Sequence, residues 1–266
     1  ACASTDQRPP PRTAPTATAS MFAPIRGFTS VQRTPQTDLK LGSVLAFVAG
    51  AANAGGFLAV GQYTSHMTGV LSSVADNLVL GQLTMAAVGV AALLAFLMGA
   101  MTTAWLVNWG MRRNLRSAYG LPLFLEAAAL LVFGLFGAGI SLMTQLFVPL
   151  TVLLLCFIMG LQNAVITKIS RSVIRTTHIT GLITDFGIEL GKLLYLNRRS
   201  DHQPVQANRN KLRIHGQLMV CFFVGGLSGA LGFKHLGTIT TVPLAALLVL
   251  LVLRPALDDW QRLHPA

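Results

Sequence analysis

The stretch AGAANAGGFLAVGQYTSHMTG, residues 49–69, joins the end of a long apolar run to a short polar segment. A second stretch, MGLQNAVITKISRSVIRTTHITG, residues 159–181, has the same layout much later in the chain. In both, an Asn-Ala pair is followed by a hydroxyl residue and a His, and then by Thr-Gly. Because polar residues recur in the same order within apolar sequence, we predict an internal duplication.

The composition is typical of a membrane protein. Of the 266 residues, 53% are hydrophobic and 11% are charged, whereas roughly a quarter are charged in an ordinary soluble domain. A transmembrane helix needs about 20 mostly apolar residues. Six stretches meet this requirement, namely 41–61, 84–111, 121–143, 146–167, 214–233 and 236–253. The sequence therefore predicts an all-α polytopic membrane protein with about six transmembrane helices.

The match between the two halves continues into a later helix. SHMTG at 65–69 aligns with THITG at 177–181, and FLMGAMTTA at 96–104 resembles FFVGGLSGA at 222–230. Each unit then holds three spanning helices and one short polar half-helix. Since an odd number of spans reverses the direction of the second copy, we predict two inverted three-helix repeats, an arrangement found in many transporters.

These units define the expected domain organisation. Residues 1–38 are rich in Pro, Thr, Ala and Arg without periodicity, which predicts a disordered N-terminal tail. The first membrane repeat is expected over 39–145 and the second over 146–256, followed by a short C-terminal tail at 257–266.

The basic residues indicate orientation. The net charge is +11, and most Lys and Arg residues lie between apolar runs, in the gaps 112–116 and 168–213. Cytoplasmic loops of membrane proteins have this excess of positive charge, so both termini are expected in the cytoplasm and segment 62–83 outside. The lipid bilayer is the expected partner. Nucleic-acid binding is not expected, because it requires clustered and accessible cations.

AGAANAGGFLAVGQYTSHMTG and MGLQNAVITKISRSVIRTTHITGLITDFGIELG resemble the YoaK family of bacterial inner-membrane proteins, a family of unassigned function. The resemblance covers roughly 40–254 and implies a six-helix protein of the bacterial inner membrane, with no implied activity. The chain departs from the family pattern at Asn53, where the family has Asp, and at Val70, where it has Asn. The second motif departs less.

Ten polar residues in or beside the repeated stretches are candidates for a substrate or ion pathway. Ionisable groups at membrane depth are costly, which makes them functional candidates. Asp76 and Glu189 lie late in their segments, so they could instead sit in water at an interface. The ten residues are Asn53, His66, Thr68, Asp76, Gln162, Asn163, His178, Thr180, Asp185 and Glu189.

Structural interpretations compete with these assignments. His66 and His178 could titrate near neutral pH, or each could cap the start of a half-helix together with its neighbouring Thr. As metal ligands they lack a third and fourth partner at a convincing spacing, so no metal or cofactor is expected. Asn53 and Asn163 could bind substrate or form interhelical hydrogen bonds.

The favoured function is a secondary transporter or channel for a small solute or ion. A membrane-embedded enzyme is the first alternative, but the chain carries none of the usual catalytic motifs, so we do not expect an enzyme. A second alternative is a non-transporting membrane factor that binds a partner through the basic loop 192–213. The Gly-rich segment around Gly225 and Gly229 would permit a homodimer.

Overall fold

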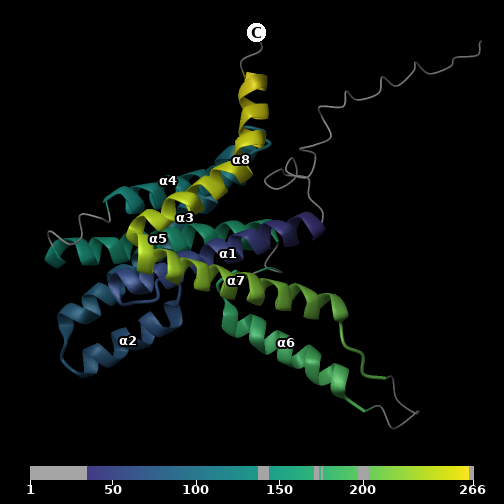
Figure 1. Cartoon of the computed structure of the whole chain (residues 1–266), viewed down its shortest axis with the longest axis horizontal. Coiled ribbons are helices and arrows are strands. Elements are labelled where there is room, and N and C mark those ends of the chain that lie inside the picture. The colour runs from purple at the N-terminus through teal and green to yellow at the C-terminus, as the bar shows by residue number, and fades with distance from the viewer. Residues whose placement is uncertain (1–34, 137–143, 171–173, 175, 197–203, 264–266) are drawn as a thin grey trace, which may run out of the picture.

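The structure is a computed structural model and describes residues 35–136, 144–170, 174, 176–196 and 204–263. Throughout this part of the chain the regular elements are helices (Figure 1), so the predicted all-α class is confirmed here. The elements are α1 (Pro35–Val60), α2 (Met67–Val79), α3 (Leu83–Arg112), α4 (Gly120–Phe136), α5 (Thr144–Ile169), α6 (Ile179–Leu194), α7 (Arg209–Leu236), the 3-10 turn η4 (Gly237–Thr240) and α8 (Thr241–Leu263).

Several helices are long and apolar enough to cross a membrane. Within the described ranges four stretches meet this description, namely Gln36–Val60, Leu83–Arg112, Pro149–Ile169 and Arg209–Arg262. The last stretch contains both α7 and α8, which are separated at η4, where Gly237 has a φ of 64°. Gly120–Leu135 is a shorter apolar helix. These lengths and compositions indicate a membrane protein.

The predicted boundaries differ from the observed helix ends at both termini. Most of the predicted tail 1–38 lies outside the described residues, but its last four residues already form the first turn of α1. At the other end, α8 continues through most of the predicted tail 257–266 and ends at Leu263.

The helices pack in two parallel pairs, α1 with α7 and α3 with α5. Gln217 Nε2 donates to Ser43 Oγ at 2.9 Å near the start of α1 and α7. Lys168 Nζ donates to Asn108 Oδ1 at 3.1 Å near the end of α3 and α5. Each pair therefore joins a helix from the first half of the chain, α1 or α3, to a helix from the second half, α7 or α5.

Glycines bring the backbones of these pairs together. A Cβ on Gly50 would overlap the carbonyl oxygen of Phe222, and a Cβ on Gly160 would overlap that of Phe96. Small residues at helix crossings allow this close approach in membrane proteins. The two contacts involve residues that the sequence alignment had matched, Gly50 with Gly160 and Phe96 with Phe222.

Further contacts sort the helix ends into two groups. Gln162 Nε2 donates to Leu45 O at 2.9 Å, and a Cβ on Gly56 would meet the Leu155 side chain, so α5 runs antiparallel to α1 and ends near its start. Asp259 in α8 accepts from Ser117 N at 2.8 Å, and Thr241 Oγ1 donates to Leu130 O at 2.8 Å, so α4 and α8 are also antiparallel. We call the end of the bundle where α1, α4 and α7 begin and α3, α5 and α8 end the basic end, and the other the opposite end.

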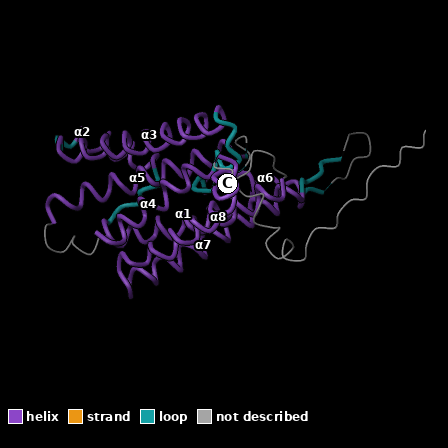
Figure 2. Tube along the Cα trace, turned by 90° about the horizontal axis from the view of Figure 1, so that it is seen from above, coloured by secondary structure: helices purple, strands orange, loops and turns teal. Residues whose placement is uncertain are grey.

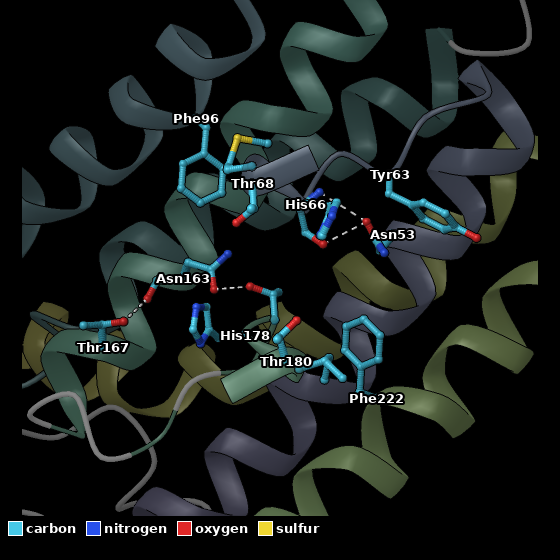
Figure 3. Close-up of a pocket in the computed structure, with 14 residues that line it drawn as sticks. Asn53, Tyr63, His66, Thr68, Phe96, Asn163, Thr167, His178, Thr180 and Phe222 are labelled. Carbon is cyan, nitrogen blue, oxygen red and sulfur yellow. Dashed lines mark hydrogen bonds between the residues drawn. The ribbon is translucent and has the colours of Figure 1, made fainter. Parts of the chain in front are cut away.

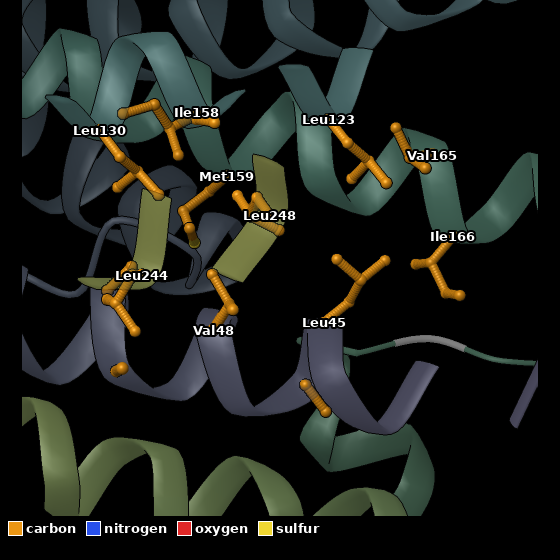
Figure 4. Packing of buried hydrophobic residues seen from close by; sticks show 14 of the residues in the cluster. Leu45, Val48, Leu123, Leu130, Ile158, Met159, Val165, Ile166, Leu244 and Leu248 are labelled. Carbon is orange, nitrogen blue, oxygen red and sulfur yellow. The ribbon is translucent and has the colours of Figure 1, made fainter. Parts of the chain in front are cut away.

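The main core lies where α1, α4, α5 and α8 meet (Figure 4). Val48 of α1 lies beside Leu248 of α8 and Met159 of α5, and Leu45 of α1 points towards Leu123 of α4. All are at most 7% exposed. This core fixes α1 and α5. Each is followed in the chain by a short helix, α2 or α6, and these two short helices are called the half-helices below.

The half-helices α2 and α6 extend in opposite directions. Figures 1 and 2 show them at opposite ends of the long axis of the molecule. At roughly 1.5 Å per residue, α2 and α6 are about 20 and 24 Å long, shorter than the hydrocarbon core of roughly 30 Å. α2 leads to the opposite end, where α3 starts, and α6 leads to the basic end, where α7 starts.

Candidate functional site

Two matched asparagines hold the starts of the half-helices. Asn53 Oδ1 in α1 accepts from Ser65 N at 3.2 Å and from Ser65 Oγ at 2.9 Å. Asn163 Oδ1 in α5 accepts from Thr177 Oγ1. After each long helix the chain therefore turns back along that helix before the half-helix begins. These bonds support the interpretation of Asn53 and Asn163 as structural hydrogen-bonding residues.

His66 and His178 occupy the N-cap positions of α2 and α6, but not as capping side chains. Neither imidazole makes a side-chain cap hydrogen bond, so the predicted capping role is wrong for these rings. Each ring instead folds over the first helical turn. A Cβ on Gly69 would overlap the His66 ring, and one on Gly181 would overlap the His178 ring. The glycine of each Thr-Gly pair thus leaves room for the imidazole, and the ring is oriented by the first turn of the helix.

A cavity of about 860 Å³ lies where the two half-helices begin (Figure 3). Figure 3 shows both asparagines and both histidines around this space. The lining residues come from both halves of the chain, and most form matched pairs in the sequence alignment. They are Asn53, Tyr63, Ser65, His66, Met67, Thr68, Phe96, Asn163, Thr167, Thr177, His178, Ile179, Thr180 and Phe222.

The cavity brings together six of the ten candidate residues. These are Asn53, His66, Thr68, Asn163, His178 and Thr180. The lining offers hydroxyl, amide and imidazole groups between two phenylalanine rings, and none of its described residues is acidic. Such a surface can bind a small polar solute through hydrogen bonds.

The other four candidates lie outside this cavity lining. Asp76 on α2 and Asp185 on α6 are exposed. Gln162 is fully buried and donates to Leu45 O, which joins α5 to α1. Glu189 lies four residues after Asp185 on α6, and its side chain turns towards the start of α7.

Glu189 connects the end of α6 to the start of α7. Its carboxylate accepts from Asn208 N at 2.7 Å and from Lys192 Nζ at 2.9 Å, and the side chain is almost completely buried. The Asn208 backbone N–H, followed by the Lys192 ammonium, lowers the pKa of Glu189 from its usual value, and burial opposes this shift. Glu189 therefore stays ionised and closes the α6–α7 connection.

Several lining residues were not among the candidates. Ser65 and Thr177 occupy matched positions in SHMTG and THITG, so the alignment already contained the signal for them. Phe96 and Phe222 are also matched, at the start of FLMGAMTTA and FFVGGLSGA. As apolar residues within apolar helices, they could not be distinguished from core or lipid-facing positions. Tyr63 has no matched signal.

Metal ligation finds no further support in the described ranges. Within them, no group of three His, Cys, Asp or Glu residues lies close enough to hold a metal ion. Cys156 and Cys221 are both free thiols.

The fold and the site define a polytopic helical membrane protein with a cavity lined by polar and aromatic side chains from its two halves. A family model described as "Protein of unknown function (DUF1275)" matches residues 41–254. The chain belongs to this family. The matched residues are nearly those over which the sequence resembles the YoaK family, roughly 40–254. The YoaK name itself stays a prediction. No curated protein and no solved structure matches the chain.

Proposed function

We propose that this protein is a transporter or channel for a small polar solute or ion, which binds in the central cavity. The observation that carries the proposal is the position of the cavity at the starts of α2 and α6, with matched polar side chains from both halves around it. In transporters with inverted repeats, discontinuous helices build the substrate site in this way near the middle of the membrane.

The helix contacts support two inverted repeats with six spans. α1, α2, α3 and α4 correspond in order to α5, α6, α7 and α8. The contact of Gly99 with the Phe157 carbonyl matches that of Gly225 with the Phe47 carbonyl, since a Cβ on either glycine would overlap the oxygen. Exchanging the two halves therefore exchanges equivalent contacts. α2 runs towards the opposite end and α6 towards the basic end, as inversion requires.

The charge distribution supports a cytoplasmic basic end. Arg112, Lys168 and Arg209 all lie at this end, and cytoplasmic loops carry an excess of Lys and Arg. In this orientation, both termini are on the cytoplasmic side of a bacterial inner membrane. The exposed apolar side chains of α3, such as Met98, Met101 and Trp105, would contact lipid. We assign the polar residues to solute binding and not to catalysis.

Access to the cavity from both faces of the membrane tests this proposal. Thr180 lines the cavity, so Thr180→Cys would be placed in a full-length chain whose Cys2, Cys156 and Cys221 are replaced by Ser. Sealed vesicles of defined orientation would be treated with a small, membrane-impermeant methanethiosulfonate reagent. A transporter or channel exposes its central site to both faces, so modification is expected in right-side-out and in inside-out vesicles.

Thr176→Cys is the matched control, because Thr176 lies in the same connection, is completely buried and does not line the cavity. We expect it to react from neither face. Modification of Thr180→Cys from only one face, or from neither, would contradict transport through this cavity.

A further inference from the structure

A second cavity of about 420 Å³ lies between α2 and α3. It is lined by Gln62, Tyr63, His66, Gly69, Val70, Ser73, Asn77, Gln82, Met85, Val88 and Gly89. Tyr63 and His66 also line the central cavity. These two side chains therefore stand between the two spaces, and the second cavity extends from them along α2 towards the opposite end.

The lining of the second cavity is polar along one face of α2. His66, Val70, Ser73 and Asn77 follow each other at intervals of three or four residues, which places them on one side of the helix. Asn77 Nδ2 donates to Ser73 Oγ at 3.2 Å. Leu71 and Leu78, which do not line this cavity, are more than half exposed. A polar stripe beside an apolar one is expected where a helix separates water from lipid, since lipid cannot satisfy amide and hydroxyl groups.

We propose that this second cavity is the water-filled route by which the solute reaches the central cavity from the opposite end, with Tyr63 and His66 as its gate. The inference rests on the proposed transport function and adds the entry path and the gating residues. The Tyr63 ring stacks on Phe57, with ring centroids 4.5 Å apart. Both rings are exposed by at least 40%, so Tyr63 can leave this contact without disturbing the core.

The matched position at the basic end makes a different contact. In the alignment, Ser73 corresponds to Asp185 and Asn77 to Glu189. The Asn77 side chain donates to Ser73 Oγ of its own helix, whereas the Glu189 carboxylate accepts from the Asn208 backbone N–H just before α7. As part of this proposal, the Glu189–Asn208 contact holds α6 against the start of α7 and so restricts access from the basic end.

Two positions on α2, two residues apart, test the route. Ser73→Cys lines the second cavity, and Leu71→Cys lies on the same helix but outside that cavity. Each would be introduced into the chain without native cysteines and treated with the impermeant methanethiosulfonate reagent on the face at the opposite end. We expect Ser73→Cys to react at least ten times faster than Leu71→Cys. Equal rates, or no reaction at Ser73→Cys, would overturn a water-filled route.

The gate is tested by removing the Tyr63 side chain. Tyr63→Ala should raise the rate at which Thr180→Cys is modified from the opposite end several-fold, whereas Tyr63→Phe, which keeps the ring, should leave it nearly unchanged. An unchanged rate in Tyr63→Ala would overturn the gate. If Ser73→Cys reacts as expected but Thr180→Cys is reached from one face only, the transport function fails while the route stands. If Ser73→Cys stays unreactive while Thr180→Cys is reached from both faces, only the route fails.

Discussion

The carbonyl oxygen of Phe222 occupies the space that a Cβ on Gly50 would need, so that α1 and α7 touch through their backbones. The same relationship joins Phe96 and Gly160 between α3 and α5. At such crossings the glycine is required for its lack of a side chain, because the neighbouring atom belongs to the main chain and cannot turn away.

Adjacent glycines in α7 allow a direct test of this packing. A Cβ on Gly225 would overlap the Phe47 carbonyl, whereas on Gly226 it would meet only ordinary contacts, the nearest at 3.6 Å from the Gly50 oxygen. Gly225→Ala should destabilise the protein by about 1–3 kcal/mol through overpacking. Gly226→Ala should be neutral or gain up to about 1 kcal/mol from helix propensity. Thermal unfolding in detergent measures both, and equal effects would contradict the close crossing.

Asp259 should anchor the connection between α3 and α4 to α8. Its carboxylate accepts from Arg116 N at 3.0 Å, from Ser117 N at 2.8 Å and from Ser117 Oγ at 2.7 Å. Asp259→Ala leaves these donors without their acceptor and should cost about 1–3 kcal/mol. The neighbouring Asp258 is more exposed, and Asp258→Ala should change the unfolding temperature little. A comparable loss in both variants would show that the carboxylate contacts are unimportant.

The Asn53 side chain should be needed as a hydrogen-bond acceptor for Ser65. Asn53→Asp keeps an acceptor oxygen and should leave the start of α2 in place, whereas Asn53→Leu removes it. We expect Asn53→Leu to slow the modification of Thr180→Cys from the opposite end by about ten-fold, because a displaced α2 start narrows the cavity. If Asn53→Asp slows it equally, the amide itself has a further role, such as binding the solute, and the acceptor explanation is wrong.

Glu189 should hold the basic end closed over a wide pH range. Because its folded-state pKa is lowered, its carboxylate bonds contribute stability that is fully present above the unfolded pKa of about 4.3. This contribution is lost only as the pH falls through the lower folded value. Hydrogen exchange at the Asn208 amide, corrected for the intrinsic rate, should therefore be constant from pH 8 to about pH 5.

Replacing the carboxylate provides the matching variants for this contact. Glu189→Leu should increase exchange at Asn208 by about ten-fold or more, whereas Glu189→Gln, which keeps an acceptor oxygen, should have a smaller effect. Glu189→Leu should also accelerate modification of Thr180→Cys from the basic end. No change in either measurement would contradict the closing role of Glu189.

Most of the helix positions, and about half of the candidate site, could be predicted from the sequence. Long apolar runs predict membrane helices well because their length must match the bilayer. The aligned polar residues predicted His66 and His178 beside a common space, and the structure places both in the lining of one cavity. The alignment singled out both residues because polar residues within apolar sequence have few reasons to recur in the same order.

The remaining features depended on tertiary contacts that no local pattern encodes. The direction of the Glu189 side chain is set by the Asn208 amide, which comes 19 positions later. The role of Phe96 is set by the cavity beside it, since the residue itself resembles any other apolar helix residue. The break between α7 and α8, by contrast, lies at Gly237, close to the gap between the predicted stretches 214–233 and 236–253.

During synthesis, α1 leaves the ribosome long before α7, its packing partner, exists. The glycine faces of α1 and α3 are therefore covered by lipid or by the insertion machinery until the second half of the chain is synthesised and inserted. Neither half can complete its packing alone, because each supplies the partners that the other lacks. The two halves thus depend on each other for assembly. If they were expressed as separate polypeptides, they would acquire their native structure only by associating in the membrane.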